Sequence, residues 1–189
     1  MESRFEHPED LGRARLKVVV PFVQIAPGVR EALAATGHEW EELYVGDSDE
    51  SYFNLLSGLW TGGEGFIVIE HDVIVRPDTL DELVNCECSW GCFPVPYLGG
   101  AYAGMACVKF AGWLTQQYPD AMQQVGTMSN ADHLPKHFCT IDSWLQMRVL
   151  PGFGLRRHEH GPVLGHYRTY VGSPWPTHGC RGPRPTEET

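Results

Sequence analysis

Strand-like apolar segments alternate with helix-like segments along the first half of this chain. Residues 16–23 are β-branched and almost continuously apolar, which is typical of a strand buried on both faces of a parallel sheet. A helical stripe over 29–34, a short strand over 40–45, a helix over 51–60 and an apolar strand over 65–69 follow. This order predicts an α/β fold in one domain, with a mainly parallel sheet flanked by helices and ligands bound beyond the carboxyl ends of the strands.

The second half of the chain is less regular. After a third helix near residues 80–83, we expect further strands and helices and then mostly loop from residue 151. The expected elements are strands over 91–96 and 101–110 around a Gly99-Gly100 turn and helices over 112–125 and 140–149. The predicted organisation is a lead-in over 1–15, one domain over 16–178 and a tail over 179–189.

Charge and composition exclude several classes of protein. The formal net charge is −10, which disfavours a general polyanion binder, although Arg156, Arg157 and Arg168 could form a local basic patch. The apolar runs are far shorter than the roughly 20 residues that span a bilayer. The first ten residues are polar and acidic, without the apolar segment of a secretory signal, which predicts a cytoplasmic protein. Phosphate-loop, dinucleotide-binding and common hydrolase motifs do not occur in the sequence.

Acidic residues follow two of the predicted strands. Glu70 and Asp72 come directly after the apolar strand that ends near Ile69, and Asp47 and Asp49 come after the preceding strand. Strand alternation would point Glu70 and Asp72 to the same side, where two carboxylates could share one divalent cation. The alternatives are a polar strand end before a helix that Pro77 begins and, for Asp47 and Asp49, solvated helix capping.

The segment 66–83 resembles the glycosyltransferases of the GT-A fold, in particular family-two-like members. In that family an apolar strand leads into Asp-x-Asp, a short apolar stretch, a proline and a helix; here Glu70 replaces the first aspartate. The resemblance extends over roughly residues 16–170 and implies that Asp72 is the principal metal ligand, with Glu70 assisting it or contacting the donor ribose. It further implies that Asp47 or Asp49 holds the uracil or ribose of the donor.

The resemblance also assigns roles to residues of the second half. Asp142 takes the place of the catalytic base, at the expected start of a helix, with a helix cap as the alternative. The Gly99-Gly100 segment would let sugar and acceptor approach the backbone, unless it only forms a hairpin. His166 would complete the metal shell, with His160 or His158 as substitutes. Arg168 or Arg157 would neutralise the diphosphate leaving group.

The implied activity is transfer of a sugar from a UDP-sugar to a hydroxyl group with Mn²⁺ or Mg²⁺, with inversion. Compact enzymes of this type occur in bacteriophages and actinobacteria, so the acceptor would be a hydroxymethylated DNA base or a virion protein and the location the host cytoplasm. A nucleotidyltransferase is one alternative. The other is a non-catalytic zinc module built on Cys86, Cys88 and Cys92, with a histidine or Cys107 as a fourth ligand.

Overall fold

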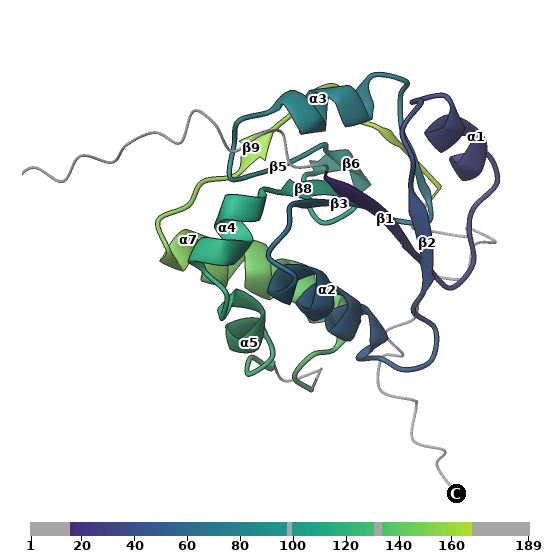
Figure 1. Cartoon of the computed structure of the whole chain (residues 1–189). Coiled ribbons are helices and arrows are strands. Elements are labelled where there is room, and N and C mark those ends of the chain that lie inside the picture. The colour runs from purple at the N-terminus through teal and green to yellow at the C-terminus, as the bar shows by residue number, and fades with distance from the viewer. Residues whose placement is uncertain (1–15, 98–99, 131–133, 168–189) are drawn as a thin grey trace, which may run out of the picture.

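A six-stranded mixed sheet forms the centre of the protein (Figure 1). The computed structural model describes residues 16–97, 100–130 and 134–167, so the predicted lead-in and tail lie outside it. The strand order is β2-β1-β3-β8-β5-β9, and five of the six strands run in the same direction, with only β8 antiparallel. The strands are β1 (Lys17–Phe22), β2 (Glu41–Tyr44), β3 (Phe66–Ile69), β5 (Trp90–Cys92), β8 (Cys107–Phe110) and β9 (His158–Glu159). The predicted α/β fold with a mainly parallel sheet is therefore confirmed.

Helices cover both faces of the sheet and create two cores. One core surrounds Trp60, and the other lies between the sheet and two helices on the opposite face. The first face carries α2 (Ser51–Thr61), α4 (Gly112–Gln117), α5 (Ala121–Val125), α6 (Phe138–Trp144), the π-helical segment η1 (Leu145–Val149) and α7 (Leu150–Gly152); the second carries α1 (Val29–Ala34) and α3 (Thr79–Asn85).

Trp60 is the central side chain of the larger core. Its indole packs edge-on against Phe66 of β3 and Phe110 of β8, with ring centroids 6.3 and 5.4 Å away. The indole N–H donates a hydrogen bond of 2.8 Å to the carbonyl oxygen of Tyr118, so this buried donor is satisfied. The contact joins α2 to both central strands and to the end of α4.

Two separate two-stranded sheets contain the segments that follow the ends of β3 and β5. β4 (Val73–Ile74) pairs antiparallel with β10 (Gly165–His166), and β6 (Val95–Tyr97) pairs antiparallel with β7 (Gly100–Tyr102). Within the described residues, no helix is long and apolar enough to cross a membrane.

Several predicted elements were wrong in extent. The helix expected over 112–125 is two helices, because Pro119 cannot continue α4 and Tyr118 already leaves helical geometry. The strand expected over 101–110 is interrupted at residues 103–106. The region after residue 151, expected to be loop, contains β9 and β10, whose histidines and glycines gave no apolar alternation.

Two glycines provide a test of the packing at the start of β3. A Cβ at Gly65 would lie 2.9 Å from the backbone nitrogen of Gly112, whereas a Cβ at Gly58, inside α2, meets nothing within 4 Å. We expect Gly65→Ala to lower the free energy of unfolding by about 1–3 kcal/mol, because backbone must move. Gly58→Ala should raise it by about 0.5–1 kcal/mol through helix propensity. Urea unfolding of both variants measures the difference, and equal effects would contradict this packing.

Candidate active site

Asp72 and His166 meet at the end of the central strand. β3 ends at Ile69, and the chain turns over residues 70–73, where the Val73 N–H donates a 3.1 Å hydrogen bond to the Glu70 carbonyl oxygen. β4 then pairs with β10 in a register that sets His166 opposite Val73. As a result, His166 Nε2 lies 3.4 Å from Asp72 Oδ2, with both side chains almost fully buried.

The surroundings of His166 indicate which of its two ring nitrogens carries the hydrogen. Nδ1 lies 3.2 Å from the carbonyl oxygen of Pro96, which can only accept, so Nδ1 carries the hydrogen. In the neutral ring, Nε2 therefore presents its lone pair toward Asp72. A buried carboxylate beside an imidazole lone pair fits a divalent cation, and a backbone carbonyl at the other nitrogen is the usual outer-shell support of a metal-binding histidine.

Glu70 belongs to the same edge but not through strand alternation. The strand ends before Glu70, so residues 70–72 lie in a turn, and the argument that a continuing strand aligns Glu70 and Asp72 was wrong. The backbone N–H of Glu70 donates to the Ala106 carbonyl, which holds the turn against the segment leading into β8. The half-buried Glu70 is therefore positioned by its backbone at the end of the sheet.

Asp142 faces this edge from α6. Tyr102 Oη donates a 2.7 Å hydrogen bond to its Oδ2, while Oδ1 is buried without a hydrogen-bond partner in the described part of the chain. Burial raises the pKa of Asp142 above its ordinary value, although Tyr102, the Met105 backbone and Arg157 each act to lower it. Asp142 lies inside α6 rather than at its start, so the helix-cap alternative is wrong.

Gly104 and Tyr52 complete the surroundings of Asp142, and the sequence did not single out Tyr52. A Cβ at Gly104 would lie 2.2 Å from the Tyr102 ring and 2.7 Å from Asp142 Oδ2, so only glycine fits there. Burial raises the pKa of Tyr52 well above its ordinary value, with further increases from the charges of Glu70 and Asp142. Tyr52 thus lies near both carboxylates, and its buried hydroxyl has no hydrogen-bond partner among the described residues.

Asp47 and Asp49 follow β2 and are exposed. The residue preceding α2 is Glu50, and the helix has no side-chain cap among the described residues, so neither aspartate caps it. The Asp49 carbonyl accepts a hydrogen bond from the Phe138 N–H, and its carboxylate lies 3.8 Å from His137 Nε2. The start of α6 is thereby tied to the loop before α2.

The glycine and arginine predictions have mixed outcomes. Gly100 pairs with Tyr97 in the β6–β7 hairpin, whereas Gly99 and Arg168 lie outside the described residues. Arg157 donates hydrogen bonds to Glu159 and to the Ala103 carbonyl, next to Gly104. These contacts place Arg157 on the Asp142 side of the edge.

Cys86, Cys92 and Cys107 lie in three different environments. Cys92 is fully buried in the Trp60 core, where burial raises the pKa of its thiol to about 12. Cys86 instead lies beside His158 and His160, so the structure does not bring together Cys86, Cys88 and Cys92 as a set. Cys107 is buried in the core on the other face. His158 and His160, the predicted substitutes for His166 as metal ligand, lie beside Cys86 instead of Asp72.

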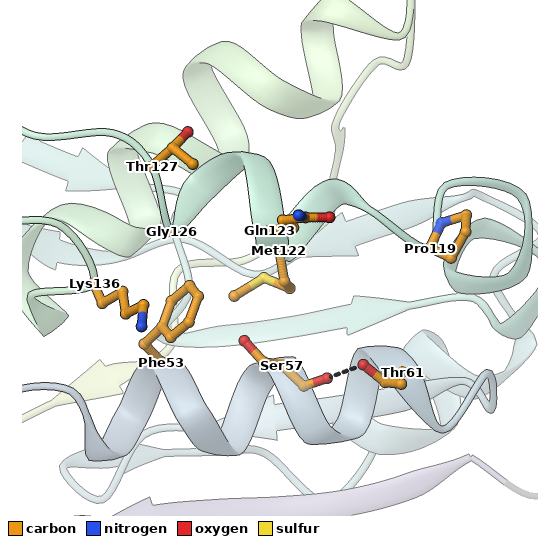
Figure 2. Close-up of a pocket in the computed structure, with 9 residues that line it drawn as sticks. All are labelled: Phe53, Ser57, Thr61, Pro119, Met122, Gln123, Gly126, Thr127 and Lys136. Atoms are coloured by element: carbon orange, nitrogen blue, oxygen red, sulfur yellow. Dashed lines mark hydrogen bonds between the residues drawn. The ribbon is translucent and has the colours of Figure 1, made fainter.

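An open hollow of about 440 Å³ lies between α2 and α5 (Figure 2). The ammonium of Lys136 lies 5.6 Å from the centroid of the Phe53 ring there. Among the lining residues, the one ionisable side chain is that of Lys136, and none is a carboxylate, histidine or cysteine that would bind a metal. The lining residues are Phe53, Ser57, Thr61, Pro119, Met122, Gln123, Gly126, Thr127 and Lys136.

Comparison with known proteins shows the fold. No protein-family profile and no curated protein matches the sequence significantly. Among solved structures, the chain is similar to a glycosyltransferase involved in the glycosylation of the major capsid of PBCV-1, with a TM-score of 0.53 and 12% identity over 82% of this chain and 94% of that chain. A197 from STIV (TM-score 0.49, 8% identity, 78% and 82% covered) and CMP:2-keto-3-deoxy-manno-octonic acid synthetase complexed with CTP (0.47, 10%, 78% and 90%) follow. The likeness to the PBCV-1 enzyme confirms the expected GT-A-like α/β fold.

Proposed function

We propose that this chain is a metal-dependent glycosyltransferase that moves a sugar from a UDP-sugar to a hydroxyl acceptor with inversion. The observation that carries the proposal is the presence of two distinct polar centres at one sheet edge: the Asp72–His166 pair and the Asp142–Tyr102 pair. A backbone hydrogen bond from Glu70 to Ala106 spans the two centres, and Tyr52 lies near the carboxylates of both sides.

Asp72 and His166 would hold Mn²⁺ or Mg²⁺, with Glu70 beside them. Bound there, the cation supplies positive charge that stabilises the diphosphate as it leaves. Asp47 and Asp49 would bind the ribose or uracil. They follow β2, which runs parallel to β1 and β3, so they lie at the same edge of the sheet as Asp72. Arg157 and Arg168 are the candidate cationic partners of the donor, and the Gly99-Gly100 segment would let sugar and acceptor approach the backbone.

Asp142 would act as the general base. Its carboxylate accepts the proton of the acceptor hydroxyl as that oxygen attacks the anomeric carbon and the bond from this carbon to the diphosphate breaks. A raised pKa makes the carboxylate a stronger proton acceptor, provided that it is ionised at the working pH. Its Oδ1 accepts no hydrogen bond from the described residues, and we assign this oxygen to the proton of the acceptor. The acceptor classes we propose are a virion protein and a hydroxymethylated DNA base.

Donor binding is the first test. We expect UDP or a UDP-sugar at about 100 times its Kd to raise the melting temperature by about 5–10 °C in the presence of Mn²⁺, because only the folded chain binds it. Chelation with EDTA, or Asp72→Asn, should abolish the shift. Thermal unfolding with UDP-glucose, UDP-GlcNAc, UDP-galactose and CTP compares the donors. A shift with CTP and pyrophosphate release, without a shift for any UDP-sugar, would indicate a nucleotidyltransferase.

Asp142→Asn should separate stability from activity. The folded state raises the pKa of Asp142, so the ionised carboxylate at neutral pH costs folding free energy, which the neutral amide avoids while still accepting from Tyr102. We expect the melting temperature to rise by about 2–4 °C and glycosyl transfer, or donor hydrolysis, to fall by about 10²- to 10⁴-fold. The exposed Asp120→Asn is the control for both measurements. Full activity in Asp142→Asn would exclude this residue as the base.

Tyr102→Phe should change the pH dependence. The tyrosine hydroxyl stabilises the ionised form of Asp142, so its removal raises the Asp142 pKa further. The acid limb of the kcat/KM profile should therefore move to higher pH. At pH values above that limb, kcat/KM should fall less. Tyr118→Phe, on the far side of the core, should leave the profile in place; an unmoved acid limb in Tyr102→Phe would contradict the assignment.

A further inference from the structure

We propose that Cys86, Cys88, His158 and His160 form a structural zinc site that fastens the outermost strand β9 to the connection between α3 and β5. The proposal is independent of the glycosyltransferase function, because none of these residues belongs to the Asp72–His166 or Asp142–Tyr102 pairs. It rests on ligand geometry, on the glycine beneath the cluster and on the support of one buried histidine.

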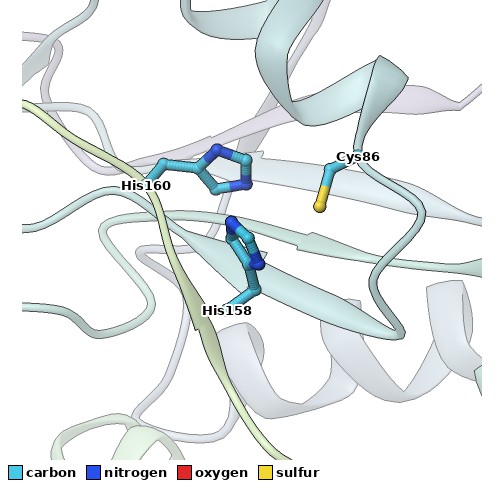
Figure 3. Close-up of side chains that lie close together, drawn as sticks. All are labelled: Cys86, His158 and His160. Atoms are coloured by element: carbon cyan, nitrogen blue, oxygen red, sulfur yellow. The ribbon is translucent and has the colours of Figure 1, made fainter.

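Three potential ligand atoms lie close to one another. The Cys86 sulfur and one ring nitrogen from each of His158 and His160 all lie within 4.8 Å of one another, and Figure 3 shows the three side chains converging. His158 lies on β9 and His160 just after it, and the centroids of their rings are 4.6 Å apart. The parallel register that sets His158 beside Gly91 brings them to the connection that carries Cys86.

We assign Cys88, whose sulfur lies over the same glycine as His160 Nε2, as the fourth ligand. A Cβ at Gly91 would lie 2.8 Å from the Cys88 sulfur and 3.1 Å from His160 Nε2, so both ligand atoms occupy the space above this glycine. Any side chain at position 91 would push them apart. The Cys88 backbone N–H also lies 3.4 Å from the Cys86 sulfur, a donor placed to stabilise a thiolate.

His160 is held as a metal-binding histidine is held. Its ring stacks on Phe93, with centroids 4.9 Å apart, and its Nδ1 faces Glu82 Oε2 at 3.8 Å. The side chain is only 9% exposed. Its Nε2, on the cluster side, is buried and has no hydrogen-bond partner in the described part of the chain. A carboxylate behind one nitrogen and an open lone pair at the other is the usual outer-shell arrangement of a zinc ligand.

The surroundings fix the cysteine side of the cluster as well. The buried Lys109 of β8 donates a hydrogen bond from Nζ to the Cys86 carbonyl oxygen. This contact anchors the chain where α3 ends, and it places the ammonium group near the Cys88 sulfur. Cys86 and Cys88 are therefore presented from a restrained backbone.

The donor set selects zinc. Two thiolates and two imidazoles favour tetrahedral Zn²⁺, whereas the carboxylate and imidazole at the active site suit Mn²⁺ or Mg²⁺. β9 has only two residues and pairs on one side, and the chain from it leads to β10 and His166. Zinc at this point would restrain the start of the segment that delivers His166.

Metal analysis of the full chain, purified under reducing conditions and dialysed without chelator, tests the proposal. We expect about one zinc per chain, and none or a small fraction in Cys86→Ser, Cys88→Ser and His158→Ala. Cys107→Ala, a buried thiol outside the cluster, and Asp72→Asn should retain full zinc. Folded wild-type protein without zinc, or zinc lost in Asp72→Asn but kept in Cys86→Ser, would overturn the proposal. Because the zinc measurement requires no nucleotide, its result is independent of the donor-binding test.

Cobalt substitution keeps the test valid if a cysteine variant does not fold. Co²⁺ added to the metal-free wild-type chain should give intense visible bands of tetrahedral coordination and near-ultraviolet sulfur-to-cobalt charge transfer. His158→Ala, which removes an exposed side chain, should lose the tetrahedral bands while circular dichroism remains native. Weak octahedral bands in the wild type, or unchanged bands in His158→Ala, would contradict the assignment.

Discussion

The pairing of β3 with strands on both sides is the constraint on which the rest of the structure depends. All four residues of β3 are buried, and they alternate between the two cores, with Phe66 and Val68 in one and Ile67 and Ile69 in the other. β3 runs parallel to β1 and antiparallel to β8, so the end of β3 lies beside the start of β8. The turn that carries Asp72 and the segment that contacts Asp142 consequently meet at one place.

The β6–β7 hairpin connects the two polar centres through the backbone. The Pro96 carbonyl on β6 accepts from His166, while Tyr102 on β7 donates to Asp142, and the two strands pair directly. Each centre is thus oriented by a group on the same hairpin. Val95 anchors the hairpin in the core on the α1–α3 face, while Pro96 and Tyr102 orient the functional side chains.

The sequence predicted the parts of the fold that hydrophobic periodicity encodes. The elements β1, α1, β2, α2 and β3 appear at nearly their expected residues, because buried strands and amphipathic helices have distinct apolar spacings. Asp72, His166 and Asp142 were also selected, by resemblance to a family. The role of Tyr52 could not be predicted, since it depends on contacts between distant segments. The zinc alternative already combined Cys86 with a histidine, but the sequence could not show that both His158 and His160 lie beside it while Cys92 lies elsewhere. The local signals for this cluster were the Cys-x-Cys and His-x-His spacings, and the histidines stand in a region without apolar alternation.

The two outermost strands carry acidic side chains, and this has a consequence for how the protein behaves at high concentration. β2 presents Glu41, paired with Lys17 at 2.6 Å, and Glu42, paired with Arg30, while β9 presents Glu159, paired with Arg157. A strand from another molecule that added to either edge would have to disturb these ion pairs and desolvate their charges. Both edges of the sheet thus carry charged side chains that oppose edge-to-edge aggregation, and high salt concentrations that screen these charges would weaken that protection.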